Sequence, residues 1–107
     1  MGDRRNIKMD MGGGEVYFYT HWGGSELPKV LASALSRGKS RWDDTSYLAR
    51  IIFCEMVKNE IEGTTGYGID YQEGDKNQST IVVDCKNQHV ILEGVEIDFN
   101  LFIEVYG

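Results

Sequence analysis

The N-terminal part of the chain alternates apolar and polar residues in a way that predicts a β-hairpin. Residues 7–11 alternate, the glycines at 12–14 follow, and residues 15–22 are rich in aromatic and β-branched side chains. A period of two is that of a half-buried strand, and glycines permit a tight turn. The two faces of the second strand then carry different residues: Val16, Phe18 and Thr20 on one, and Tyr17, Tyr19 and His21 on the other.

A helical period follows. Apolar residues recur at i, i+3, i+4, i+7 and i+8, namely Leu27, Val30, Leu31, Ala34 and Leu35. Pro28 lies in the first turn, where its missing N–H costs nothing. Ser25 is a suitable N-cap, and Gly38 is suited to end the helix as the C′ residue. The pattern predicts an amphipathic helix with one buried stripe.

A second helix is predicted from the cap candidates Asp43, Asp44 and Thr45 to about Ile61. Its apolar residues surround nearly the whole circumference: Tyr47, Leu48, Ala49, Ile51, Ile52, Phe53, Cys54, Met56 and Val57. Such a helix is either enclosed within its domain or covered by a partner chain. A chain this short has little material to enclose it, so a homodimer contact is expected.

The remaining segments predict further strands and a C-terminal helix. Residues 69–71, 80–85 and 89–92 have strand spacing. The last segment fits both a strand and a helix, and we predict a short strand to Ile97 followed by a helix with Asp98 as its N-cap. The predicted order is β-β-α-α-β-β-β-α. This describes one α+β domain over residues 1–107, mainly an antiparallel sheet with two central helices, and residues 1–5 as a flexible N-terminus.

Charge and length narrow the function classes. The 107 residues include 17 acidic and 11 basic side chains, giving a net charge of −6. An acidic surface repels nucleic-acid backbones and anionic lipids, which disfavours extended nucleic acid and membranes as partners. The chain shows neither a membrane-length apolar run nor a secretory signal pattern, so a cytoplasmic location is expected.

Catalytic and metal-binding signatures are absent from the sequence. The two histidines, His21 and His89, lie far apart, and no paired spacing of metal ligands occurs. Cys54 and Cys85 sit inside apolar segments, which favours two buried thiols over a disulfide or a catalytic role. His21 beside Asp43 or Asp44 could form an acid–base pair, but no nucleophile has a suitable context. No cofactor is expected, and a non-enzymatic protein is favoured over an enzyme.

Three segments carry candidate binding residues. The first, Tyr17 to Trp22, is an aromatic strand that ends at Gly23-Gly24 beside a helix start. Aromatic faces stack on planar rings and free helix amides bind anions, a combination that suits a nucleotide-like ligand. Packing in the sheet explains the same aromatics equally simply.

The third segment, residues 63–68 with Tyr67, lacks the spacing and lysine of a P-loop, and a plain connection explains it.

The second candidate segment combines Arg41, Trp42 and Asp43 with Tyr47 and Arg50. Tyr47 and Arg50 stand at i and i+3 on the second helix, so they share a face. Arginine in an apolar helix is costly to bury unless it pairs with an acid or an anionic ligand. A structural bridge to Asp43 or Asp44 and a phosphate-binding arginine are the two interpretations.

Several sequence words also resemble a family of uncharacterised phage and prokaryotic proteins of about this length. They are Tyr19-Thr20-His21-Trp22-Gly23-Gly24, Glu26-Leu27-Pro28, Arg41-Trp42-Asp43-Asp44, Tyr47-Leu48-Ala49-Arg50-Ile51-Ile52-Phe53 and Thr65-Gly66-Tyr67-Gly68-Ile69. The resemblance implies no activity. It suggests a phage or mobile-element context, in which small proteins sequester nucleotide signals or inhibit host defence proteins.

Two functional hypotheses follow. The first is a non-enzymatic protein that sequesters a small anionic nucleotide-like ligand, as a homo-oligomer, through an aromatic and arginine pocket of Tyr19, His21, Trp22, Arg41, Trp42, Asp43, Tyr47, Arg50 and Tyr67. The second is an acidic module that binds a larger host protein through Glu60, Glu62, Asp70, Glu73 and Asp75. A solvated face explains these acids without any partner.

Overall fold

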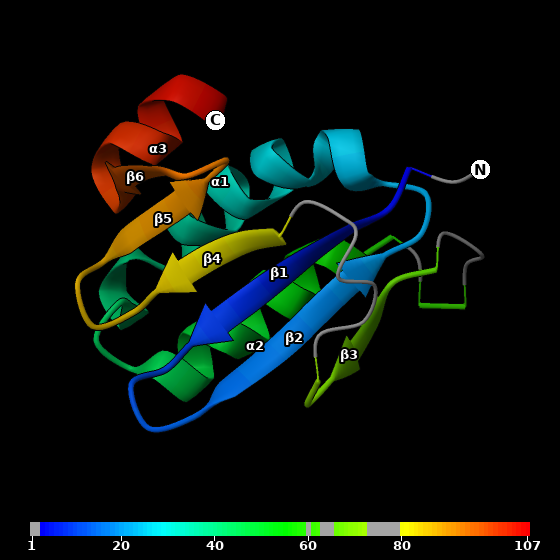
Figure 1. The fold of residues 1–107 in the computed structure, drawn as a ribbon, viewed down its shortest axis with the longest axis horizontal. Coiled ribbons are helices and arrows are strands. Elements are labelled where there is room, and N and C mark those ends of the chain that lie inside the picture. The colour runs from blue at the N-terminus through cyan, green and yellow to red at the C-terminus, as the bar shows by residue number, and fades with distance from the viewer. Residues whose placement is uncertain (1–2, 60, 63–65, 73–79) are drawn as a thin grey trace.

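The computed structural model describes residues 3–59, 61–62, 66–72 and 80–107. Within these residues, one six-stranded sheet has the order β3-β2-β1-β4-β5-β6, and three α-helices cover one of its faces (Figure 1). The elements are β1 (Arg5–Asp10), β2 (Glu15–Thr20), α1 (Leu27–Arg37), α2 (Thr45–Val57), β3 (Gly68–Asp70), β4 (Thr80–Asp84), β5 (His89–Leu92), β6 (Val95–Asp98) and α3 (Phe99–Tyr106). The predicted α+β class is confirmed, with one more strand after the helices than the predicted order has.

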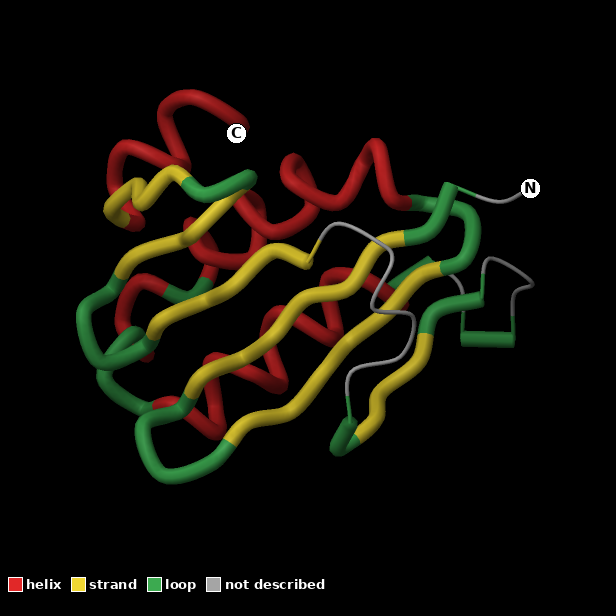
Figure 2. Tube along the Cα trace, in the orientation of Figure 1, coloured by secondary structure: helices red, strands yellow, loops and turns green. Residues whose placement is uncertain are grey.

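The sheet is mainly antiparallel. β1 and β2 form the predicted hairpin, with Met9 opposite Val16, and the Met11 N–H donates to the Gly14 carbonyl at 2.9 Å across the turn. Gly12 takes a φ of +90° there, a conformation that favours glycine. The central pair β1–β4 is parallel. In the chain, α1, α2 and β3 lie between β2 and β4 and form the long connection between these strands (Figure 2).

The core lies between the sheet and the helices. Ile7, Phe18 and Ile81 point towards the helices and are fully buried. They pack against apolar residues of all three helices, among them Leu31 of α1. The alternation predicted for β2 is therefore present, with Phe18 in this core and Tyr19 on the opposite face of the sheet.

α1 begins and ends differently from the prediction in two details. Its N-cap is Glu26, not Ser25, because Ser25 lies in a preceding 3₁₀ turn. There the Ser25 N–H and hydroxyl both donate to the Asp3 carboxylate, at 2.8 and 2.5 Å. Gly38 is the C-cap with a φ of −95°. Its small size serves packing, because a Cβ there would stand 3.1 Å from Leu48 Cδ1.

α2 is covered on only part of its circumference. Asp44 caps it by accepting a hydrogen bond from the Tyr47 N–H, and the helix ends at Val57, four residues before the predicted Ile61. Lys58 and Asn59 come next and are exposed, so no apolar contact extends the helix there. Cys54 is exposed, and its predicted burial is therefore wrong.

The C-terminal prediction is confirmed. β6 pairs with β5, and the Asp98 carboxylate accepts a hydrogen bond from the Leu101 N–H at 2.8 Å to cap α3. Phe99 and Phe102 bury the inner side of α3 in the core. Among the described residues, no helix combines the length and apolar character that crossing a membrane requires.

Candidate functional site

The nine residues proposed from the sequence do not form one cluster. Tyr47 lies near the start of α2, whereas Tyr67 lies beside Met56 near its end. Nine residues of α-helix separate these positions, which is about 14 Å at 1.5 Å per residue. The candidates therefore form one group near each end of α2. Two further candidates, Trp42 and Asp43, make contacts that stabilise the fold.

The group at the end of β2 consists of closely packed rings. The Tyr19 and His21 rings have centroids 5.4 Å apart. A Cβ on Gly66 would stand 2.7 Å from His21 Cδ2, and one on Gly68 would overlap the Tyr19 side chain. Glycine at both positions thus lets rings pack on the backbone near β3. Trp22 stays 58% exposed outside this packing.

Trp42 and Asp43 hold the fold together. The Trp42 indole N–H donates to the Leu35 carbonyl at 2.9 Å, and its ring meets Phe99 edge-on with centroids 5.0 Å apart. Asp43 accepts a hydrogen bond from the Gln88 amide at 2.9 Å. Both residues join the segment between α1 and α2 to distant parts of the fold. These contacts do not support the predicted binding role of either residue.

Arg41, Tyr47 and Arg50 do come together at the start of α2. The guanidinium carbon of Arg41 lies 4.4 Å from the centroid of the Tyr47 ring, and that of Arg50 lies 4.3 Å from it. Within the described part of the chain, neither guanidinium contacts a carboxylate. The predicted bridge from Arg50 to Asp43 or Asp44 is therefore not formed. The ring orients two exposed cations whose N–H donors remain available.

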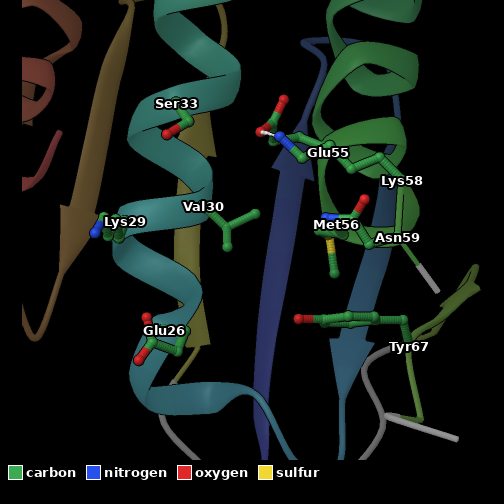
Figure 3. Close-up of a pocket in the computed structure, with 9 residues that line it drawn as sticks. All are labelled: Glu26, Lys29, Val30, Ser33, Glu55, Met56, Lys58, Asn59 and Tyr67. Carbon is green, nitrogen blue, oxygen red and sulfur yellow. Dashed lines mark hydrogen bonds and ion pairs between the residues drawn. The ribbon is translucent and has the colours of Figure 1, made fainter. Parts of the chain in front are cut away.

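A valley runs between α1 and α2 on the side away from the sheet. Three hollows of about 350, 400 and 280 Å³ meet at Glu55 and Lys58, which line each of them. Figure 3 looks onto the first hollow, where the Tyr67 hydroxyl points towards α1 and the Met56 sulfur lies above the ring. The third hollow has Ile51 and Cys54 in its lining and reaches Arg50. We call this surface the α1–α2 valley.

Glu55 joins the two helices across the valley. Its carboxylate accepts from Arg37 Nε of α1 at 3.0 Å and from Lys58 Nζ at 2.6 Å. The Glu55 side chain is only 8% exposed, whereas those of Arg37 and Lys58 are 67% and 48% exposed. The carboxylate is thus enclosed, while both cations keep free donors that face solvent at the valley rim.

Charge is divided unevenly between the helices and the rest of the chain. Residues 27–58 contain six basic and three acidic side chains, so the remainder of the chain contains five basic and fourteen acidic ones. The lining of the α1–α2 valley follows the same trend, with four basic side chains, Lys29, Arg37, Arg50 and Lys58, against two acidic ones, Glu26 and Glu55. The electrostatic potential of this surface therefore differs from that of the acidic remainder.

Sequence reasoning missed three valley residues. Arg37, Glu55 and Lys58 lie on two helices and meet only after α1 packs against α2. A partial signal was present, because Arg50, Cys54 and Lys58 stand at i, i+4 and i+8 and must share one side of α2. In the described residues no group of histidine, cysteine and acidic side chains could hold a metal ion.

Comparisons with models of protein families, with curated proteins and with solved structures find no match to this chain.

Proposed function

We propose that the protein is a non-enzymatic binder that sequesters a small anionic, nucleotide-like ligand in the α1–α2 valley. The observation that carries the proposal is the pair of guanidinium groups of Arg41 and Arg50 over the Tyr47 ring, with no carboxylate partner among the described residues. Exposed cations are ordinarily paired with acids or left mobile. Here the Tyr47 ring holds two of them, and one of these, Arg50, lines a hollow of the valley, an arrangement that supports binding of a phosphate.

The rest of the hollow suits the remainder of such a ligand. Ile51 and Cys54 give the Arg50 hollow an apolar part, and Arg37 and Lys58 add donors at its rim. Its volume of about 280 Å³ approaches the 300 Å³ lower bound typical of small-molecule sites. A planar base resting on the apolar part would place its phosphate within the cationic rim. Tyr67 lies at the far end of the valley, where a longer ligand would reach it.

Titration calorimetry and native mass spectrometry with AMP, ADP and ADP-ribose test the proposal. We expect one ligand per chain and an affinity that falls as salt rises, because the contacts are ionic. Arg50→Ala should weaken binding at least tenfold, since a hydrogen bond to a charged group contributes about 1.5–3 kcal/mol. Lys86→Ala is the matched control, because it removes one exposed cation in the β4–β5 turn.

Two results would contradict this function. One is the absence of binding by all three probes at low salt. The other is an equal loss of affinity in Arg50→Ala and Lys86→Ala, which would reduce the effect to net charge. An affinity that is unchanged in Arg50→Ala would also remove the Arg41–Tyr47–Arg50 site from consideration.

The acidic remainder of the chain supports a second candidate function, binding of a basic surface on a larger host protein. Fourteen acidic side chains against five basic ones lie outside residues 27–58. Of the acids proposed from the sequence, Glu62 and Asp70 are exposed, and Glu60, Glu73 and Asp75 lie outside the described residues. Reversing Glu62 and Asp70 to lysine should abolish capture of a cationic partner. Capture that is unchanged would eliminate this candidate.

A further inference from the structure

An apolar groove lies on the opposite flank of α2 from the valley, between this helix and the strands β2 and β3. It encloses about 310 Å³ and is lined by the apolar Phe18, Ala49, Phe53 and Ile69, with Arg50 also in its lining. We call it the α2–β3 groove. Phe18 is fully buried beneath it, and Phe53 stands over Phe18 with ring centroids 5.2 Å apart.

The groove continues into an exposed apolar surface. Ile69 is 56% exposed and the next apolar residue, Tyr71, is 77% exposed, while Cys54 of α2 is exposed beside them. Single exposed apolar residues are common, but a group of them beside an apolar groove marks a contact surface. This flank of α2 faces away from α1, and β2 and β3 supply only the floor and the outer wall of the groove.

We propose that the occupant of this groove is a second copy of the chain, in a two-fold homodimer. β3 is the terminal strand of the sheet, and no described strand pairs with its outer edge. In an antiparallel pair of two β3 strands centred on Ile69, the two isoleucines stand opposite each other on the same face. That face is the helix side, because Ile69 also lines the groove, so each isoleucine packs against the other groove.

Charge and size agree with a second copy. In this register Asp70 stands opposite the partner's Gly68, so the two Asp70 carboxylates do not oppose each other. Arg50 is the one ionic side chain in the groove lining, which keeps like-charge repulsion at the contact small. The chain exposes 6263 Å² in total, and the about 800 Å² per partner that stable complexes bury is about one eighth of that surface.

Light scattering after size exclusion tests the proposal. We expect wild-type protein at twice its chain mass of 12.1 kDa. Ile69→Asp should halve the measured mass, because it places a carboxylate next to its own copy across the two-fold axis. Val95→Asp is the matched control, since Val95 is 59% exposed on β6, the opposite edge strand, and this variant should remain dimeric.

Cross-linking with a flexible bis-maleimide provides a second measurement. Cys54 is exposed and lines the groove, whereas Cys85 is buried. Wild-type protein should give a covalent dimer through Cys54, and Cys54→Ser and Ile69→Asp should not. A monomeric wild type, a dimeric Ile69→Asp or a monomeric Val95→Asp would each overturn the proposal. Ile69 and Val95 line none of the three hollows of the valley, so the light-scattering outcomes are distinguishable from a loss of ligand binding there.

Discussion

The two flanks of α2 carry different chemistry although one 13-residue helix forms both. Towards α1, the α1–α2 valley is crossed by the ion pairs of Glu55, and cations line its rim. Towards β3, the α2–β3 groove is almost entirely apolar and its outer wall, Ile69, is exposed. We therefore propose an anionic small molecule for one flank and a second copy of the chain for the other.

This difference shows how a small domain accommodates a helix that is apolar on nearly all sides. The inward residues Leu48 and Ile52 are fully buried, and α1 covers part of the next side. The chain has no further element among its described residues to place over the β3 flank. The sequence pattern of α2 therefore shows how much apolar surface the helix has, and the packing of neighbouring elements determines which side of it stays exposed.

The largest expected effect concerns the floor of the groove. Phe18→Ala removes a fully buried ring and its contact with Phe53, so the free energy of unfolding should fall by about 3–5 kcal/mol. Urea unfolding measures the loss. Phe53→Ala removes a half-buried wall of the same groove and should cost less. Equal losses would show that the groove wall is as enclosed as its floor, and the contrast between the two flanks would fail.

The two cysteine thiols provide a further comparison, between the exposed surface of α2 at Cys54 and the buried core at Cys85. Burial, with the nearby Asp10 and Asp84 carboxylates, raises the pKa of the Cys85 thiol to about 11. The unfolded chain releases this proton first as pH rises above about 9, so the contribution to stability is complete below that pH. It is lost as pH approaches 11, by about 2–3 kcal/mol.

Urea unfolding between pH 8 and 11 measures this loss by comparing variants. Cys85→Ala should show a shallower decline than wild type, because the buried thiol no longer titrates. Cys54→Ala removes the exposed thiol on α2 and should keep the wild-type decline. A decline that is the same in all three proteins would assign the alkaline instability to other groups.

The sequence was sufficient for the elements whose signal is local. The stripe of α1, the β1–β2 alternation and the Asp98 cap each depend on neighbours within a few residues, and the structure contains all of them. The burial of Cys54 was predicted wrongly, because an apolar helix says nothing about which side its neighbours cover.

From the sequence, candidate residues could be placed together only where they are close along the chain. Tyr47 and Arg50 share a helix face by their spacing, and the structure brings Arg41 to the same ring. Trp42 and Asp43 are binding candidates because they stand beside Arg41 in the sequence, and their contacts with Phe99 and Gln88 were not predictable because these partners are distant in sequence. The contacts of Glu55 with Arg37 depend in the same way on the packing of α1 against α2, which no single-helix pattern contains.

The smallest expected effect has opposite signs for stability and for binding. Glu55→Gln leaves Arg37 and Lys58 without their carboxylate, and both cations are exposed enough to remain hydrated. The free energy of unfolding should fall by only about 0.5–1 kcal/mol. The valley gains one unit of positive charge, so its affinity for ADP should rise by up to about fivefold at low salt. Glu96→Gln makes the same charge change on β6 and should alter neither quantity. If ADP affinity instead falls in Glu55→Gln, the carboxylate holds the rim cations in the orientation that binding needs, and the order of Arg37 and Lys58 contributes more than the added charge.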